Sequence, residues 1–418
     1  MESPRALRVV IASRIFSPEP SAASFMLDAI ARRFRDEGHH VTVLTTRPPA
    51  GIAASSIRGI TIKRARVRRD RQGYVRGYLS YLSFDVPLAF RLLATRRADL
   101  YVVEPPPTTG AVTRVTTALL RRPYVYDAAD LWSDAAQMVT SSRLVIGLLR
   151  STELFAIRGA AHAFAISTGL IERLDELNVH TPTTAIGFGV NTGAFHFQPA
   201  GEVPATPAQQ IDVPTGPYLI YPGSYSEWHG AGIFVEAFAR LRAEHPELRL
   251  LFVGNGADRP ALERRCAELG LAPDRVEFRE PIEAPRLNTL LANAVVSLAS
   301  LKPGQGYDYA FTTKIYSSLA AGCPVVFSGT GPTVPFIADA AREQAVGVAV
   351  PYDVESVAGA LRAAIASAPP AGKRQSLSNW ARERFSIEQA AAIVVRTSVE
   401  VVAEHRARHA PRGGLTES

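Results

Sequence analysis

Three consecutive segments near the N-terminus indicate the fold: the apolar run RVVIAS (8–13), the amphipathic stretch FMLDAIARRFRDEGHH (25–40) and the apolar run VTVLTT (41–46). Strand, helix and strand in this order are the repeating unit of a parallel sheet covered by helices. The alternation continues through DLYVVE (99–104), PYVYDAAD (123–130) and AHAFAIS (161–167). The first half of the chain is therefore predicted to be a doubly wound, Rossmann-like α/β domain.

The alternation stops at 196–217, HFQPAGEVPATPAQQIDVPTGP, which is rich in Pro, Gly, Ala and Gln and typical of a linker. It resumes at YLIYPGS (218–224), a predicted strand, and IFVEAFARLRAEHP (233–246), whose large apolar side chains share one helical face. Further strands are predicted within LRLLFVGNG (248–256), VEFREP (276–281), AVVSLAS (294–300) and PVVFSG (324–329). A second Rossmann-like domain is therefore predicted.

These patterns divide the chain into four parts. We predict an N-terminal domain at 1–196, a linker at 197–216 and a C-terminal domain at 217–375. At 376–418 we predict a helix that returns to the first domain and ends in a frayed tail. Because ligands of open α/β sheets bind at the carboxyl ends of the strands, we expect the two domains to face one another across a cleft.

The composition is that of a soluble globular protein, with 418 residues of which 47% are hydrophobic and 20% charged. The net charge of +7 favours an anionic partner, and no sequence signature indicates nucleic-acid binding. Cys266 and Cys323, the two cysteines, provide neither a disulfide framework nor a cysteine metal site. No apolar run reaches the ~18 to 20 residues of a spanning helix. We expect a cytoplasmic protein, at most peripheral on a membrane.

Carboxylates follow two of the predicted strands. Asp127, Asp130 and Asp134 lie within YDAADLWSD (126–134), and Glu104 begins EPPPTTG (104–110). At the end of a strand these groups could bind sugar hydroxyls or act as a base. Alternatively, Asp130 caps a helix, Asp134 is solvated and the proline-rich loop is structural support. Both interpretations remain open.

Two glycine-containing turns also have two interpretations each. In VGNG (253–256), Gly254 and Gly256 would let the backbone approach a phosphate, or would only form a strand–helix turn. GFGVNTGAF (187–195) is either a ligand loop or a hinge turn before the linker.

Lys314 opens a short predicted helix within FTTKIYSSLAAGCPVVFSG (311–329). It is one of four lysines in a chain with 42 arginines, and no carboxylate stands beside it in the sequence. An ammonium at this place opposes the helix dipole, which a bound anion would compensate. Alternatively, only the aliphatic stem packs and the ammonium reaches solvent.

The run 58–76, RGITIKRARVRRDRQGYVR, contains eight basic residues and one acid. The aromatic residues Tyr78, Tyr81 and Phe84 follow it. A basic stripe beside exposed aromatic side chains suits an anionic membrane surface. The alternative is a solvated face of an arginine-rich protein.

Seven segments share their order and spacing with a known family. They are PEPSAASFMLDAIARRFRDEGHHVTVLTTRP (18–48), VEPPPTTG (103–110), YDAADLW (126–132), GFGVNTGAF (187–195), YPGSYSEWHGAGIFVEAFARL (221–241), VGNG (253–256) and TTKIYSSLAAGCPVV (312–326). Across roughly residues 7–395 the chain resembles glycosyltransferase family 4, and most closely the branch that builds bacterial surface polysaccharides. The resemblance implies a GT-B fold. It also implies retaining, metal-independent transfer of a hexosyl unit from a nucleotide sugar to a glycan or lipid-linked acceptor, without a cofactor.

Together with the patterns above, the resemblance implies a donor site on the C-terminal domain and an acceptor side on the N-terminal domain. The expected donor-binding residues are Gly223, Ser224, Gly254, Gly256, Arg279, Glu280, Pro281, Thr312, Thr313, Lys314 and Ser317. The expected acceptor-side residues are Ser21, Ala22, Ser24, Glu104 and Asp127. Catalytic roles are expected for Asp130, Lys314 and His229, with no metal ligand. Lys314, with His229 beside it, would supply positive charge to the leaving pyrophosphate.

The chain differs from the family at several of these places. Ser317 replaces a glutamate that accepts hydrogen bonds from the donor ribose, Tyr309 stands near a second glutamate and Ala129 near a frequent catalytic histidine. Ser21–Ser24 replace a glycine pair, and Ser224 and His229 stand near an Arg/Lys pair. These differences motivate an alternative function, a non-catalytic GT-B protein that binds a nucleotide sugar or scaffolds a complex. A sugar-nucleotide epimerase on the same fold is a third hypothesis.

Overall fold

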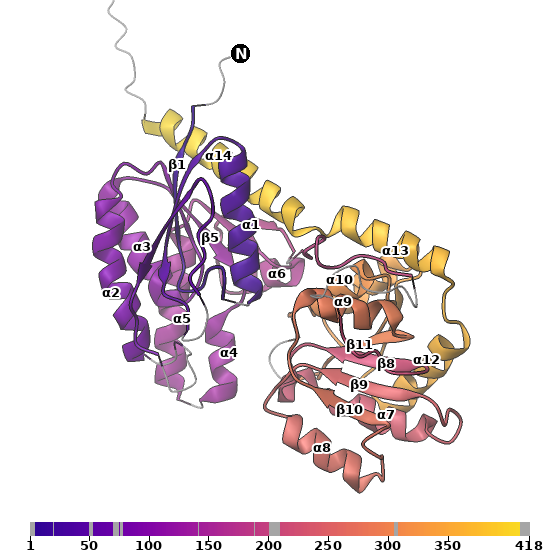
Figure 1. The fold of residues 1–418 in the computed structure, drawn as a ribbon. Helices are drawn as coiled ribbons and strands as arrows, with labels where there is room; N and C mark the ends of the chain where they lie inside the picture. The colour runs from indigo at the N-terminus through magenta and orange to yellow at the C-terminus, as the bar shows by residue number, and fades with distance from the viewer. Residues whose placement is uncertain are drawn as a thin grey trace, which may run out of the picture. The chain divides into compact units, whose positions relative to one another are not determined.

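A computed structural model describes residues 5–19, 21–49, 53–69, 75, 78–140, 142–187, 189–199, 210–304 and 308–409. The chain divides into two units, one of Met1–Phe188 with Glu388–Ser418 and the other of Gly189–Ile387 (Figure 1). Each unit has its own parallel sheet with helices on both faces. The prediction of two doubly wound, Rossmann-like α/β domains is confirmed. The domain boundaries predicted at 196/197, 216/217 and 375/376 stay predictions at that precision.

The first unit contains a seven-stranded sheet in the order β3-β2-β1-β4-β5-β6-β7. Its strands are β1 (Arg8–Ala12), β2 (His40–Thr46), β3 (Ile60–Ala65), β4 (Leu100–Val103), β5 (Tyr124–Ala128), β6 (His162–Ala165) and β7 (Thr183–Ala185). Its helices are α1 (Ala22–Asp36), α2 (Tyr78–Ala94), α3 (Pro107–Leu120), α4 (Trp132–Val139), α5 (Arg143–Arg158), α6 (Thr168–Glu176) and the returning α14 (Ile387–His409). All pairings are parallel, and the strand order reverses between β1 and β4.

The second unit contains a six-stranded sheet in the order β10-β9-β8-β11-β12-β13. Its strands are β8 (Tyr218–Pro222), β9 (Arg249–Val253), β10 (Val276–Arg279), β11 (Val296–Leu301), β12 (Val325–Gly329) and β13 (Gly347–Val350). Its helices are the short 3₁₀ helix η2 (Glu227–His229), α7 (Gly232–Leu241), α8 (Arg259–Glu268), α9 (Ala284–Asn293), α10 (Lys314–Ala320), α11 (Thr333–Ala340), α12 (Val354–Ala366) and α13 (Ala371–Arg384). The order reverses between β8 and β11, so the two sheets repeat one topology.

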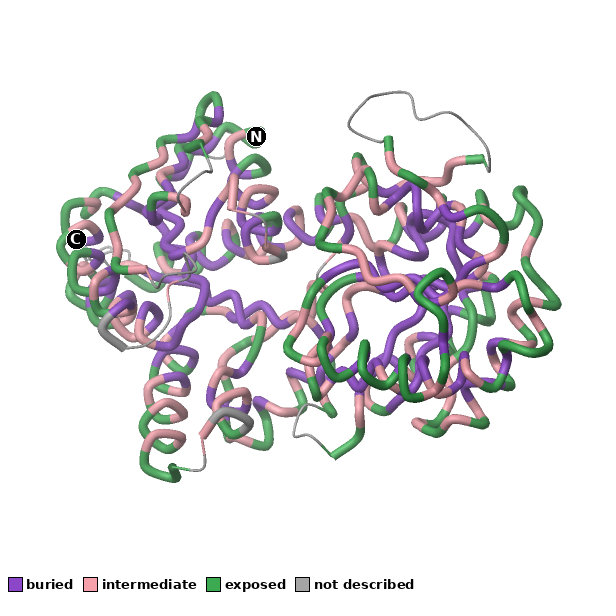
Figure 2. Tube along the Cα trace, turned by 60° about the horizontal axis from the view of Figure 1, so that its bottom comes forward, coloured by how far each residue is buried: buried purple, intermediate pink, exposed green. Residues whose placement is uncertain are grey.

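The cores follow the periodicity of the sequence. In α1 the buried apolar residues Met26, Leu27, Ile30, Ala31 and Phe34 recur every three or four positions, which places them on one helical face. The central strands β4, β5, β8 and β11 are buried on both faces, as parallel strands covered by helices require, whereas the edge strands β3 and β13 are partly exposed. Figure 2 shows buried residues running through each unit. Within the described residues, no helix combines the length and apolar character needed to cross a membrane.

Candidate functional site

Lys314 lies at the place in the second sheet where the strand order reverses. It is the first residue of α10, and its Nζ donates to Tyr221 Oη at 3.0 Å and to the Ser224 carbonyl at 3.2 Å, both at the carboxyl end of β8. Ligands of doubly wound sheets bind at this position. Burial lowers the pKa of Lys314 to about 7. Within the described part of the chain no carboxylate forms an ion pair with the ammonium, so its charge is available to an anion.

His229 lies in η2, directly after β8, and is buried. Its Nδ1 accepts a hydrogen bond from the Ser226 amide at 3.1 Å, and its ring stacks on Trp228 with 3.6 Å between centroids. Burial, with a smaller effect from Lys314, lowers the pKa of His229 to about 3. The imidazole is therefore neutral near pH 7 and carries its proton on Nε2. The positive charge that the sequence analysis assigned to it is absent, because burial opposes protonation; its catalytic role stays a prediction.

Gly254 and Gly256 of VGNG allow close packing between two loops. A Cβ at Gly254 would lie 2.0 Å from the Gly223 carbonyl oxygen, and one at Gly256 would lie 1.7 Å from the Tyr225 carbonyl oxygen. The loops after β8 and β9 thus touch backbone to backbone, which only glycine allows. This contact holds Gly223–Tyr225 beside Lys314. A phosphate contact by these glycines stays a prediction.

The polar residues next to Lys314 form most of their hydrogen bonds within the second unit. The buried Thr312 donates its amide to Thr333 Oγ1 at 3.2 Å, and Thr313 precedes α10 without capping it. Ser317 Oγ donates to the Lys314 carbonyl at 2.9 Å, a common bond of serine within a helix. Only the oxygen lone pairs of Ser317 therefore remain for a ribose hydroxyl.

The predicted base-binding residues lie at the end of β10. The Arg279 guanidinium is held by the Glu277 carboxylate at 2.6 Å and by the Asp212 carbonyl. Glu280 is exposed and pairs with Arg259 and, more weakly, with Asn255. Pro281 follows on the exposed surface. Their role in donor binding stays a prediction.

In the first unit, a buried polar cluster lies where β1 and β4 diverge. Ser13 Oγ lies 2.8 Å from Glu104 Oε2 and also 2.8 Å from the Ile15 carbonyl. Burial raises the pKa of Glu104 to about 8, although the hydrogen bond with Ser13 and the charge of Arg14 act in the opposite direction. A protonated Glu104 can donate to Ser13, which in turn donates to Ile15. Arg14 is buried beside this pair, with its guanidinium 4.3 Å from the centroid of the Tyr81 ring.

Asp127 is a second buried carboxylate on this edge, at the end of β5. Burial, reinforced by Asp130, raises its pKa to about 7. It borders a small cavity of about 10 Å³ whose other walls are apolar or backbone. The residues around the cavity are Ala23, Met26, Asp127, Ala129, Ile166, Ile186 and Gly187. Asp127 and Glu104 can each gain or lose a proton near neutral pH, which general acid–base chemistry needs.

The other predicted acceptor-side residues have structural partners. Ser21 caps α1 by accepting from the Ser24 amide at 3.1 Å, and Ser24 itself is buried. Ala22 begins α1, and its side chain lies outside the described residues. Asp130 is exposed in the loop after β5.

Two alternatives from the sequence analysis are wrong. Asp130 does not cap α4, because the buried Glu153 accepts from the Trp132 and Ser133 amides at 2.6 and 3.1 Å. Asp134 is not solvated: it is buried and pairs with Arg150 at 2.6 Å and Arg173 at 2.9 Å. Glu153 lies 21 residues beyond Trp132, so sequence spacing gave no signal of this contact.

The basic run at 58–76 differs from the predicted stripe. Arg64 donates to the Ser17 carbonyl at 2.6 Å, and Arg69 pairs with Glu19 at 3.3 Å, so both are tied to their own unit. Residues 70–74, 76 and 77 lie outside the described part, as does the Tyr78 side chain. Phe84 is fully buried, and Tyr81 packs between Arg14 and Trp132. The exposed aromatic residues that the stripe required are therefore not found at Tyr81 and Phe84.

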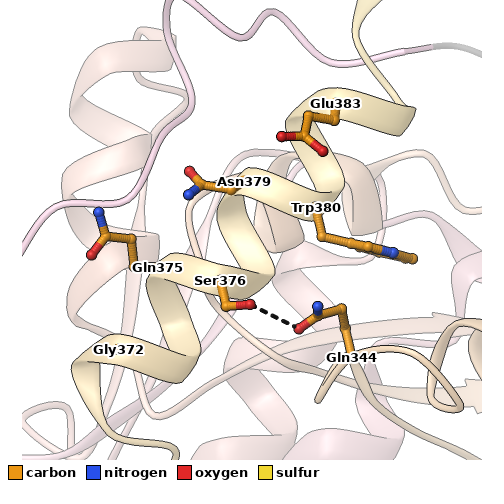
Figure 3. A pocket seen from close by; sticks show the side chains of 7 residues that line it. All are labelled: Gln344, Gly372, Gln375, Ser376, Asn379, Trp380 and Glu383. Carbon is orange, nitrogen blue, oxygen red and sulfur yellow. Dashed lines mark hydrogen bonds between the residues drawn. The ribbon is translucent and has the colours of Figure 1, made fainter.

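A separate groove of about 440 Å³ lies along α13 in the second unit (Figure 3). It is lined by Gln344, Gly372, Gln375, Ser376, Asn379, Trp380 and Glu383, none of which was predicted as a site residue. Ser376 Oγ reaches Gln344 Oε1 at 3.4 Å across it. In the described part of the chain, no three His, Cys, Asp or Glu side chains gather in a way that could hold a metal.

Comparisons with known proteins agree with this architecture. Residues 23–189 match the family model "Glycosyl transferase 4-like domain", and residues 216–367 match "Glycosyl transferases group 1". No curated protein matches the chain.

Among solved structures, sucrose-phosphate synthase from Thermosynechococcus elongatus is similar with a TM-score of 0.73 and 18% identity, over 95% of this chain and 100% of that one. Anabaena Alr3699/HepE in complex with UDP-glucose gives 0.68 and 19%, over 94% and 99%. WaaG, a glycosyltransferase involved in lipopolysaccharide biosynthesis, gives 0.63 and 18%, over 92% and 99%. At these identities the structural likeness shows the fold, which is the GT-B fold. The two family models lie one in each unit and together span most of the chain, which therefore belongs to the family 4 type of glycosyltransferases.

Proposed function

We propose that this glycosyltransferase moves a hexosyl group from a nucleotide sugar to a lipid-linked or other membrane-proximal glycan, with retention at the anomeric carbon and without a metal ion. Its place would be the cytoplasmic face of the plasma membrane, in the synthesis of a bacterial surface polysaccharide or glycoconjugate. The observation that carries the donor assignment is Lys314: a cation without a carboxylate partner in the described residues, at the switch point of the second sheet.

The chemistry follows from charge. When the bond between the anomeric carbon and the phosphate oxygen breaks, negative charge develops on the nucleoside diphosphate. The acceptor oxygen bonds to the same carbon from the same face, and its proton passes to the leaving phosphate. Lys314 is held by Tyr221 Oη and the Ser224 carbonyl, so it needs little rearrangement to stabilise this charge. His229 can add an uncharged N–H donor.

Lys314 is also suited to bind the donor as a cation. With a pKa of about 7, part of the population is neutral before binding. A diphosphate beside the amine favours the charged form and raises that pKa. Donor binding is therefore coupled to proton uptake.

The test is thermal unfolding with UDP-, GDP- and dTDP-sugars, for the wild type, Lys314→Met and Lys373→Met. Lys373 is an exposed lysine on α13 and serves as the matched control. A ligand at 100 times its Kd adds about 2.7 kcal/mol to the free energy of unfolding, which corresponds to a shift of several degrees. We expect one nucleotide class to stabilise the wild type and Lys373→Met, and Lys314→Met to lose most of the shift.

Equal shifts in the wild type and Lys314→Met would refute the Lys314 assignment. Donor binding without transfer or slow donor hydrolysis, over a broad acceptor panel, would favour the non-catalytic alternative. Ser317 motivates that alternative, since its hydroxyl proton is bonded to its own helix.

A further inference from the structure

The outer surfaces of α2, α3 and α5 in the first unit expose an unusual number of large apolar side chains. The most exposed on each helix are Phe90 (70%), Leu119 (72%) and Leu144 (80%). Leu82 and Val86 precede Phe90 at intervals of four residues, so they continue one stripe along α2. The three helices lie side by side, with α3 packed between α2 and α5 (Figure 1).

These side chains are concentrated rather than scattered. Of the eleven large apolar side chains exposed in the described residues, nine lie on these three helices. Single exposed apolar residues are normal on a protein surface, but a contiguous apolar face marks an interaction site. They do not face the core of the unit, since other residues of the same helices are buried there, such as Phe84 on α2, Thr113 on α3 and Ile157 on α5.

The charges on this face have a single sign. The carboxylates of α2, α3 and α5 are those of Asp85 and Glu153, and each is at most 1% exposed. Asp85 accepts from the Thr108 and Thr109 hydroxyls, both at 2.6 Å, and Glu153 caps α4.

Exposed arginines stand at the ends of these helices. Arg96 and Arg97 follow α2, Arg121 follows α3 and Arg143 begins α5. The half-buried Arg114 lies over the Phe155 ring, with 4.1 Å to its centroid. In the described residues, the three helices thus present apolar and cationic groups without an exposed carboxylate.

We infer that the α2–α3–α5 face docks on an anionic lipid bilayer, with its apolar side chains at the boundary between headgroups and acyl chains and its arginines on the headgroups. Basic and apolar groups together are the combination that anionic membrane surfaces bind. A second copy of the chain fits less well, because a two-fold contact places a patch against itself and would oppose arginine to arginine. The inference deepens, and rests on, the proposed membrane-proximal acceptor, and it locates the membrane contact elsewhere than the basic run at 58–76.

The test is co-sedimentation of the full chain with vesicles of phosphatidylcholine alone, or of equal parts phosphatidylcholine and phosphatidylglycerol, without any nucleotide sugar. The variant is the double substitution Phe90→Ser/Leu144→Ser, at two highly exposed positions. The matched control is Val348→Ser, an apolar side chain 41% exposed in the second unit. We expect the wild type and the control to sediment with the anionic vesicles only. The double variant should partition at least about tenfold more weakly, because it loses the burial of two large apolar groups.

A second variant pair tests the charge. Arg96→Glu/Arg97→Glu should weaken sedimentation with anionic vesicles, whereas Arg264→Glu, at an exposed arginine of the second unit, should not. The inference would be overturned if the wild type sedimented equally with neutral and anionic vesicles. It would also be overturned if Phe90→Ser/Leu144→Ser sedimented as strongly as the wild type. A wild-type dimer in solution that Phe90→Ser/Leu144→Ser converts to a monomer, without any lipid binding, would likewise overturn it.

The two proposals fail separately. Thermal shifts with nucleotide sugars test the donor site proposed in the second unit, and they should be unchanged in Phe90→Ser/Leu144→Ser. A wild type that fails to bind anionic vesicles but keeps its nucleotide shifts would refute the docking surface alone. Vesicle binding without any nucleotide shift would remove the donor assignment alone.

Discussion

At the β1/β4 switch point of the first unit, a buried carboxylic acid, a guanidinium and a hydroxyl lie together as Glu104, Arg14 and Ser13. At the β8/β11 switch point of the second unit, Lys314 stands without a described carboxylate partner. The sheets have the same strand order around these points. Topology therefore decides where a ligand can bind, and the side chains at the strand ends decide its charge. We therefore predict that the second unit binds an anion and that the first binds hydroxyl groups and exchanges a proton.

The largest difference between the two switch points should appear when the charge of Lys314 is removed. Lys314→Met keeps the aliphatic stem and deletes the charge, so we expect kcat to fall by about 10²- to 10³-fold, as when one preorganised donor to a developing anion is lost. Steady-state transfer assays with the donor found by thermal shift measure this. Lys373→Met should keep its turnover. Wild-type kcat in Lys314→Met would mean that another group carries the leaving-group charge.

The pH dependence of nucleotide binding provides a second test of the role of Lys314. The protonated amine binds the diphosphate, and its pKa before binding is about 7. Affinity should therefore be highest below this pH and fall by at most about tenfold per unit as pH rises above it. Calorimetric titration with a nucleoside diphosphate measures the slope. Lys314→Met should remove it, and a slope of opposite sign would contradict the assignment.

The first unit should respond to pH through its own carboxylates. The folded-state pKa of Glu104 is raised to about 8, so between its unfolded value and pH 8 the folded state holds a proton that the unfolded state releases. Stability from this group is thus present at low pH and lost as pH rises. Glu104→Gln, which stays neutral, should exceed the wild type in free energy of unfolding by roughly 1–3 kcal/mol at the upper end of this window.

Denaturant unfolding of both proteins across that window measures the difference, which should grow with pH. Glu172→Gln, at an exposed glutamate of the same unit, is the control and should show no such trend. A difference that stays constant with pH would mean that Glu104 titrates normally.

The smallest expected effect concerns Ser317. An ionised acceptor forms a stronger hydrogen bond than a hydroxyl, by about 1–2 kcal/mol, so Ser317→Glu should tighten donor binding about tenfold if the ribose lies there. Ser318→Glu is not a usable control, because Ser318 is buried against Ser297. Calorimetry with the donor and with the corresponding sugar phosphate, which lacks the ribose and the base, distinguishes a ribose contact. Unchanged affinity would place the ribose elsewhere.

Much of the fold could be predicted because its signals are local. Alternating apolar runs and amphipathic helices mark both sheets, and the glycosyltransferase resemblance rests on segments that are continuous in the sequence. The failures concern contacts between distant residues. α2 is apolar on nearly all sides, so its periodicity does not show that Phe84 faces the sheet while Phe90 faces outward. The role of Glu153 as a cap for α4 depends on how α5 packs.

The sequence by itself determined the two Rossmann-like units and the isolation of Lys314 as a rare lysine without a neighbouring acid in the sequence. Only the tertiary structure decided the protonation of the candidate site. The pKa values of Lys314, His229, Glu104 and Asp127 are shifted mainly because burial withdraws them from water. Only the tertiary structure, likewise, revealed the exposed apolar face of α2, α3 and α5. Burial is a property of what packs around a residue, and it is set by segments far away along the chain.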